Sequence, residues 1–291
     1  MNRMDTARRA QVIRCLVEGN SINSTVRMTG VAKNTVLKLL VEVGAACSAF
    51  LNETMRDLKC ERLQADEAWS FCYAKQRNVT PEMAEERVAG DVWAWVAIDA
   101  DSKLIPTWLL GKRDSGCATE FIQDLASRLS NRVQLTTDGL KVYINAVYDA
   151  FGENIDYSIL HKIYGAVPTG EARYSPAKCI GCDKQPVIGN PDPKHVSTSY
   201  IERQNLTMRM SMRRFTRLTN GFSKKIENHS ASVALYMMYY NYGRKHSTLG
   251  TSPAVKAGLT DHVWSVEEIV ALLEKGERNA TEIALAWRGT N

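Results

Sequence analysis

Between residues 61 and 138 the chain reads ERLQADEAWSFCY (61–73), VWAWVAIDA (92–100), KLIPTWLLGK (103–112), GCATEFIQDLASRL (116–129) and VQLTTD (133–138). The first three segments and the last are apolar runs bounded by turn residues, which predicts strands. Asp101 and Ser102 fit a tight turn, so we expect the second and third strands to pair as a hairpin. The remaining segment repeats its apolar residues at helical spacing.

The chain continues with alternating elements. A helix is expected around 141–151 and a strand at IDYSILHKI (155–163). An antiparallel three-stranded start followed by alternating units predicts a mixed α/β sheet with helices on both faces. Residues 164–198 are rich in Gly, Pro, Lys and Asp without a clear period, and we interpret them as an insertion or ordered loop. Further helices are expected from Ser199 to about Arg217, at 222–243 and from Ser265, where Glu268 has capping-box spacing.

The N-terminal residues divide into three helical patterns, RRAQVIRCLVEG (8–19), SINSTVRMTG (21–30) and VAKNTVLKLLVEVG (31–44). Two helices separated by a tight turn that contains glycine are typical of a helix-turn-helix, whose second helix enters the major groove of DNA. Lys33, Asn34 and Thr35 then lie where base edges are read. Arg27 or Lys38 can contact a backbone phosphate. A three-helix packing module without DNA binding is the alternative.

Three carboxylates stand out by their positions. Asp66 and Asp138 close apolar segments, and Glu202 lies near the start of an otherwise basic helix. A carboxylate is costly in apolar surroundings unless a cation or hydrogen bonds accompany it, and three that converge suit a hard divalent cation such as magnesium. For any one of them, a solvated or capping carboxylate is the alternative. Glu67 is a rival ligand, but along a strand its side chain points to the opposite face from Asp66.

Charge is unevenly distributed along the chain. The 291 residues carry a net charge of +5. Residues 1–59 hold nine Lys/Arg against five Asp/Glu, and the stretch from Arg203 to Lys225 holds seven Lys/Arg and no acid. Two basic surfaces on a nearly balanced protein suit a polyanion held at defined places, although a basic helix is also often a solvated face. Together with the carboxylates, they indicate phosphodiester chemistry on nucleic acid.

Neither secretion nor a membrane is indicated. No uninterrupted apolar run approaches the roughly 18 residues of a membrane helix, and the N-terminal MNRMDTARRAQ lacks the apolar core of a secretory signal. The seven cysteines are mostly scattered, which favours reduced thiols and a cytoplasmic protein. Cys179 and Cys182 form a single CxxC, which lacks the second ligand pair of a structural zinc site. His161 and His195 are the candidates to complete such a site, but we favour unpaired thiols in a loop.

Four segments resemble the DDE transposases of bacterial insertion sequences, which share an RNase H-like core with retroviral integrases. They are DEAW (66–69), TTDG (136–139), STSYIERQNLTMRMSMRRFTRLTNGFSKK (197–225) and YYNYGRKHSTLGTSPAVKAGL (239–259). The first three closely resemble the insertion-sequence-one type, and the fourth resembles the segment that follows the catalytic glutamate in many integrase-like enzymes. The resemblance covers roughly residues 60–260. In one respect the chain departs from the pattern common in integrases, because Asp138 and Glu202 are farther apart, with the 164–198 segment as the surplus.

The resemblance implies a domain organisation and a set of site residues. Together with the N-terminal pattern, which agrees with it independently, it predicts a helix-turn-helix domain at 1–48, a connector at 49–60, an RNase H-like catalytic domain at 61–245 and a helical tail at 246–291. Asp66, Asp138 and Glu202 would be the catalytic metal-binding triad. On the same helix, the resemblance makes Asn205 and Arg209 candidates to contact DNA or support the site. Arg209, Arg213 and Arg217 recur every four residues, which predicts a row of arginines along the Glu202 face of the helix that contacts the phosphate backbone.

The expected function is that of a transposase that binds the terminal repeats of its element and cleaves and joins DNA strands. The resemblance implies two magnesium ions, or manganese in their place, double-stranded DNA as partner, and a homo-oligomer of at least two chains in the bacterial cytoplasm, associated with the nucleoid. No covalent protein–DNA intermediate is implied. The alternatives are an RNase H-like nuclease without strand transfer and a helix-turn-helix repressor derived from a transposase.

Overall fold

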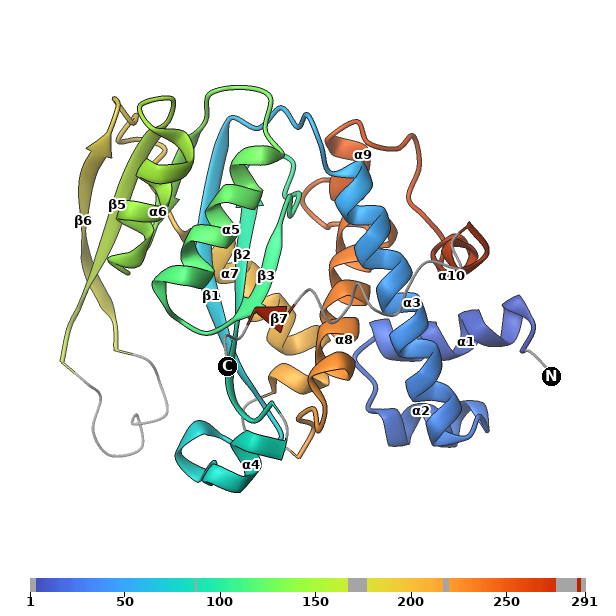
Figure 1. The fold of residues 1–291 in the computed structure, drawn as a ribbon. Helices are drawn as coiled ribbons and strands as arrows, with labels where there is room; N and C mark the ends of the chain where they lie inside the picture. Colours follow the sequence, from blue (N-terminus) through green and yellow to red (C-terminus); the bar gives the residue numbers. More distant parts are fainter. Residues whose placement is uncertain (1–3, 87, 167–176, 217–219, 276–286, 289–291) are drawn as a thin grey trace.

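The computed structural model describes residues 4–86, 88–166, 177–216, 220–275 and 287–288, and its centre is a mixed sheet (Figure 1). The strands run in the order β6-β5-β4-β1-β2-β3-β7. Strand β1 pairs antiparallel with β2 and parallel with β4, β2 and β3 are antiparallel, and β4 and β5 are parallel. The bounds are β1 (Arg62–Cys72), β2 (Gly90–Asp99), β3 (Trp108–Gly111), β4 (Gln134–Thr137), β5 (Asp156–Tyr164), β6 (Cys179–Ile188) and β7 (Trp287–Arg288). The predicted mixed α/β sheet is confirmed.

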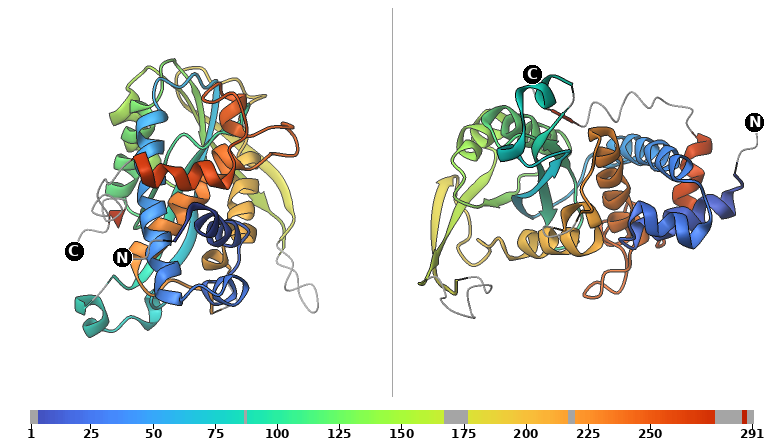
Figure 2. Two further views of the ribbon diagram at one scale, coloured as in Figure 1. Left: turned by 90° about the vertical axis from the view of Figure 1, so that its right-hand side faces the viewer. Right: turned by 90° about the horizontal axis from the view of Figure 1, so that it is seen from below.

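Helices cover both faces of this sheet. One face carries α5 and α6, which pack on each other, and the other carries α7 against β1 and β2 (Figures 1 and 2). The helices of this part of the chain are α4 (Pro81–Glu86), α5 (Ser115–Ser127), α6 (Val142–Phe151) and α7 (Ser199–Ser211). This arrangement is compatible with the RNase H-like fold that the resemblance implies, and that finer assignment stays a prediction.

Three helices begin the chain, as expected. They are α1 (Thr6–Val17), α2 (Ile22–Thr29) and α3 (Lys33–Thr54). The Ser21 hydroxyl accepts from the Ser24 N–H at 3.1 Å and so caps α2. Gly30 ends α2 with φ 67°, a left-handed conformation that glycine adopts at little cost. Helix α3 runs ten residues past the pattern at 31–44, so much of the expected connector at 49–60 is helical.

Helix α3 joins the N-terminal helices to the C-terminal part of the chain. It packs against α8 and α10, and α1 also packs against α10 (Figure 2). The C-terminal helices are α8 (Ile226–Met238), which continues into a π-turn at Tyr239–Gly243, α9 (Pro253–Lys256) and α10 (Val266–Lys275). The expected capping box of α10 is confirmed, because the Glu268 N–H donates to the Ser265 hydroxyl and the Glu268 carboxylate accepts from the Ser265 N–H. The predicted domain at 1–48 therefore shares its core with residues 226–275.

Among the described helices, α3 alone is long and apolar enough to cross a membrane, judged by length and composition. Its apolar residues face the protein, because Val36, Leu40 and Val43 are buried in the common core. A buried core helix and a membrane helix share this composition, so the property carries no argument for a membrane.

Three elements differ from the expectation, each for a tertiary reason. The predicted strand at 103–112 pairs with β2 only from Trp108, because Asn241 takes both backbone groups of Ile105 and Pro106 has no N–H to donate. Residues 179–188, expected within a loop, form β6 antiparallel to β5. Helix α7 ends at Ser211 rather than near Arg217, because Phe215 turns inward and stacks on His229 at 5.4 Å.

Candidate metal centre

The register of β1 and β4 brings two of the predicted carboxylates together. Ala65 pairs with Thr137, so the next residues on the two parallel strands, Asp66 and Asp138, lie side by side. Strand β4 ends at Thr137, whereas β1 continues, which leaves Asp66 inside a strand and Asp138 just past the end of one. The Asp138 carboxylate accepts from the Leu140 N–H at 2.9 Å, and this bond orients it at the strand end.

Glu67 completes this acidic cluster. One carboxylate oxygen each from Asp66, Glu67 and Asp138 lies within 4.8 Å of the other two. The side chains of Asp66 and Glu67 turn to opposite faces of the sheet, as expected. Asp66 accepts a hydrogen bond from Asn205 of α7 on one face, and Glu67 lies against Tyr143 of α6 on the other. Glu67 nevertheless reaches the cluster, which the alternation of side chains along a strand does not predict.

Asp66 is held by one residue of α7. The Asn205 amide donates to the Asp66 carboxylate at 2.8 Å, and Asn205 is itself buried. The pKa of Asp66 is raised to about 6, mainly by burial and also by the negative charges of Asp138 and Glu202, while the Asn205 hydrogen bond acts to lower it. Asn205 was expected to support the site or contact DNA, and its position is that of a support.

Glu67 is the most enclosed of the three acids. Its side chain is 1% exposed, and burial raises its pKa to about 7. The Arg113 guanidinium donates to one carboxylate oxygen at 3.0 Å. The other oxygen, Oε1, is buried and has no hydrogen bond of normal geometry, although the Tyr143 hydroxyl is near enough to lower the pKa of Glu67. Arg113 also lies 3.9 Å from the Asp138 carboxylate and 4.9 Å from the centre of the Trp93 ring. A single arginine therefore offsets the charge of two acids.

Glu202 lies near this cluster but is not part of it. It sits in the first turn of α7, one turn before Asn205. Its carboxylate pairs with Lys162 of β5 and accepts from the Thr198 hydroxyl at 2.6 Å. The structure thus brings Asp66 and Asp138 of the predicted triad together, whereas Glu202 forms an ion pair with Lys162. Its charge still acts on Asp66.

The residues present fit a divalent cation. Asp66, Glu67 and Asp138 form an all-oxygen donor set of the kind that magnesium and manganese prefer. Their negative charges are crowded together, and one Glu67 oxygen is buried without a hydrogen bond of normal geometry. A bound cation would supply the partner that this oxygen lacks and would relieve the repulsion between Asp66, Glu67 and Asp138.

Among the described residues, no metal cluster includes the CxxC. Cys179 and Cys182 lie exposed on β6. His195 is held elsewhere, with its Nδ1 2.7 Å from the Arg62 guanidinium. His161 packs against Gly139, beside the acidic cluster. Cys179 and Cys182 are close to each other on β6, but among the described residues neither histidine forms a metal cluster with them.

The predicted DNA-contacting residues fall into two groups. Lys33, Asn34, Thr35 and Lys38 are exposed at the start of α3. Arg209 lies on α7, whereas Arg213 falls after the end of that helix and is not on the Glu202 face. The expected row of arginines along one helix face is wrong for Arg213. Arg217 lies outside the described residues.

Sequence reasoning missed Arg113, Tyr143 and Lys162 as neighbours of the acids. Arg113 lies two residues after the end of β3 and directly before Asp114, the α5 N-cap, so the predicted hairpin and helix bounded its position without revealing its contacts. Lys162 lies on a predicted strand next to His161, but nothing in its local pattern indicates an ion pair with a residue forty positions later. These contacts depend on strand order, which local patterns do not encode.

The free energy of unfolding of the metal-free protein should fall as the pH rises from about 5 to about 8. Asp66 and Glu67 have folded pKa values of about 6 and about 7, against ordinary values of 3.8 and 4.5, so the folded state holds their protons more tightly. This stabilisation is complete below about pH 4 and is lost as the pH rises through the folded pKa values. Thermal denaturation in a chelator measures the loss, at ~2–4 °C of Tm per kcal/mol in domains of ~150–250 residues.

The double variant Asp66→Asn, Glu67→Gln isolates this effect from other titrating groups. Its Tm should depend less on pH than that of the wild type, and millimolar magnesium should raise the wild-type Tm more near pH 8 than near pH 5. An equal pH dependence in both proteins would contradict the raised pKa values.

Sequence comparisons assign no family to this geometry. No protein-family model matches the chain. No curated protein matches it either. The case for a function therefore rests on the chemistry of Asp66, Glu67 and Asp138 and on the surfaces around them.

Proposed function

We propose that the chain is a transposase that binds the ends of its own DNA element and catalyses metal-dependent strand cleavage and strand transfer. The observation that carries the proposal is the approach of Asp66, Glu67 and Asp138 within 4.8 Å at the end of β4. Such a cluster is expensive to maintain without a cation, and clusters of this kind are often functional.

Each residue has a role in this proposal. Asp66 and Asp138 would hold the cation, and Asn205 and Arg113 keep the carboxylates oriented. A bound magnesium pair would supply the charge that activates a water or 3′-hydroxyl nucleophile and stabilises the leaving oxygen during in-line displacement. Glu202 is the third ligand in the proposal. It lies one turn from Asn205 on α7, and it becomes available when Lys162 moves to another anion such as a DNA phosphate.

Helices α2 and α3 are the proposed DNA reader. Three residues connect them, Gly30 allows the sharp turn, and the first residues of α3 are exposed. These features support a helix-turn-helix with Lys33, Asn34 and Thr35 at the base edges. Because two element ends must be cut and joined, the proposed active form is a homo-oligomer of at least two chains.

Three outcomes of one experiment separate this function from its alternatives. The protein is mixed with magnesium, a supercoiled target plasmid and labelled pre-cut duplexes copied from the DNA that flanks its coding sequence. A transposase joins the duplex to the plasmid. Nicks without joining indicate an RNase H-like nuclease. Binding without either reaction indicates a repressor, and this result would overturn the proposed activity.

Asn34→Ala should remove the preference for element-end DNA. A good bidentate contact between asparagine and a base contributes about 1–3 kcal/mol of discrimination, and its loss should leave nonspecific binding nearly unchanged. Titrations with end and scrambled duplexes measure the difference. Asn78→Ala is a matched control, because Asn78 is an exposed asparagine outside α2 and α3. Loss of affinity for both duplexes in equal measure would contradict base reading by Asn34.

A further inference from the structure

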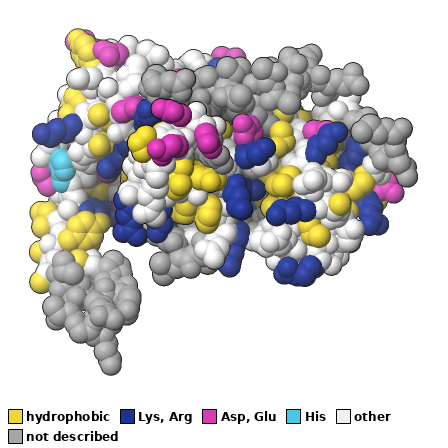
Figure 3. Space-filling view, turned by 60° about the horizontal axis from the view of Figure 1, so that its bottom comes forward, with side chains coloured by type: hydrophobic (Ala, Val, Ile, Leu, Met, Phe, Trp, Pro, Cys, Tyr) yellow, Lys and Arg dark blue, Asp and Glu magenta, His cyan; other side chains and the backbone are white. Residues whose placement is uncertain are grey.

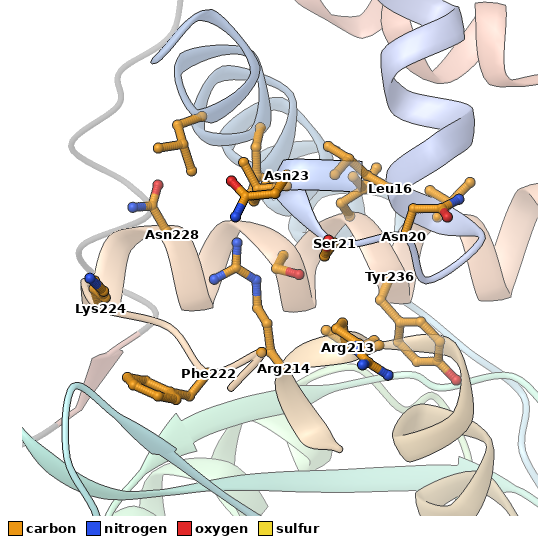
Figure 4. Close-up of a pocket in the computed structure, with 18 of the residues that line it drawn as sticks. Leu16, Asn20, Ser21, Asn23, Arg213, Arg214, Phe222, Lys224, Asn228 and Tyr236 are labelled. Carbon is orange, nitrogen blue, oxygen red and sulfur yellow. The ribbon is translucent and has the colours of Figure 1, made fainter. Parts of the chain in front are cut away.

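A cavity of about 250 Å³ lies between the N-terminal helices and the segment that follows α7 (Figure 4). Ser21, Asn23 and Lys33 line it from the side of α2 and α3. Arg213, Arg214, Lys224 and Asn228 line it from the other side. We call it the Arg214 pocket. All of its lining residues belong to the described part of the chain, and they include no Asp or Glu.

Arg214 is the feature that makes this cavity a candidate binding site. Figure 4 shows its side chain extending into the pocket toward Asn23. One guanidinium nitrogen donates to the Ser223 hydroxyl at 2.6 Å, and no acidic residue of the described chain pairs with it. Burial lowers its pKa to about 10, so it stays charged near neutral pH. A partly buried cation without an anionic partner is costly, and proteins normally supply one.

The residues behind Arg214 hold it without neutralising it. The Ser223 hydroxyl also contacts His229 Nδ1 at 2.9 Å, and His229 Nε2 contacts the Ser70 hydroxyl at 3.1 Å. Burial and the charge of Arg214 lower the pKa of His229 to about 3, so this histidine is neutral. A chain of neutral groups anchored on β1 therefore fixes the guanidinium and leaves its charge for a ligand.

The surroundings of the pocket favour a phosphate group. Arg213, Lys224 and Lys33 are exposed cations among its lining residues. On the face of the molecule in Figure 3, Lys and Arg side chains gather in dark blue patches. Arginine pairs with phosphate through two parallel N–H bonds, and apolar lining residues such as Leu16 and Leu37 suit the sugar that carries the phosphate.

We propose that the Arg214 pocket binds one backbone phosphate of double-stranded DNA, with Arg214 as the anchor and Arg213 and Lys224 beside it. The choice of DNA rests on the proposed function, whereas the preference for a phosphate rests on the pocket. Because the pocket joins the start of α3 to the segment after α7, a bound phosphate would link the proposed reader to the helix that holds Asp66 through Asn205.

The test is the salt dependence of DNA binding in a chelator. Arg214→Gln should weaken binding of a random-sequence duplex and make the slope of log K against log salt less steep by about 1. Lys256→Gln, which removes an exposed charge on α9, should leave binding and slope unchanged. An Arg214→Gln protein that is folded and keeps the wild-type slope would overturn the proposal.

A second variant keeps the test decisive if Arg214→Gln does not fold. Asn228→Asp adds a carboxylate to the pocket lining and leaves Arg214 in place. It should weaken binding of the same duplex, and inorganic phosphate should raise the Tm of the wild type but not of this variant. If phosphate raised the Tm of both proteins equally and their DNA binding were the same, the proposal that this pocket binds phosphate would be wrong.

Failure of this inference differs from failure of the proposed function. Cleavage by the wild type in magnesium with no change in binding by the pocket variants would reject the pocket and keep the transposase. Altered binding by both variants without any cleavage by the wild type would keep the pocket and reject the transposase.

Discussion

Asp138→Asn should abolish magnesium-dependent nicking and joining of DNA while the protein remains folded. The substitution removes a ligand charge with little change in volume, and the Leu140 N–H can still donate to the remaining side-chain oxygen. Loss of an outer-shell partner typically lowers metal affinity or activity by about 10- to 100-fold, and loss of a direct ligand should exceed this. Plasmid nicking and thermal denaturation, measured on the same preparation, give both results.

Asp149→Asn is the matched control for this variant. Asp149 is an exposed aspartate on α6, and the acidic cluster of the described residues does not include it. The Asp149→Asn protein should nick DNA at the wild-type rate. Magnesium-dependent nicking that survives Asp138→Asn would remove this carboxylate from the metal site and with it the present assignment.

Gly44→Ala should destabilise the whole protein. Gly44 lies where α3 meets α8, and a methyl group there would sit 2.6 Å from the Ala231 Cα and 2.7 Å from its carbonyl oxygen. Backbone atoms cannot move aside as a flexible side chain can, and overpacking of this kind costs about 1–3 kcal/mol. The gain of up to about 1 kcal/mol from replacing glycine in a helix offsets only part of this. Chemical denaturation measures the net loss.

Gly116→Ala supplies the contrast. Gly116 is also helical, in α5, but a methyl group there would meet only the Asp114 carboxylate at 3.6 Å, an ordinary contact. This variant should be as stable as the wild type or slightly more stable. If both substitutions had the same effect, helix propensity rather than the close approach of α3 and α8 would govern Gly44.

Local sequence patterns predicted the elements that bury an apolar face. Strands β1, β2, β4 and β5 and helices α1, α2, α5 and α6 lie within a few residues of their expected ranges. The hairpin of β2 and β3 followed from its turn, where Ser102 bonds the Asp99 carboxylate. The proximity of Asp66 and Asp138 followed from their placement at the strands of one sheet.

What local patterns did not predict depends on contacts distant in the sequence. Strand β6 is exposed along most of its length, so it lacks the apolar alternation by which strands are recognised. The end of α7 depends on Phe215 and His229, and the role of Glu67 depends on Arg113 from the turn between β3 and α5. Glu202 was assigned by its helix and by resemblance, but its pairing with Lys162 depends on how β5 lies beside α7.

The packing of α3 along α8 limits how this chain can be divided or recombined. A helix-turn-helix on a flexible tether could be exchanged for another with a different target, but here one continuous helix carries the exposed residues at its start and fills the core further along. A fragment that begins after Thr54 would leave the apolar side of α8 without its cover. If the proposed DNA reading is right, a change of target would have to arise by substitution at the few exposed positions of α3, not by transfer of the N-terminal helices as a unit.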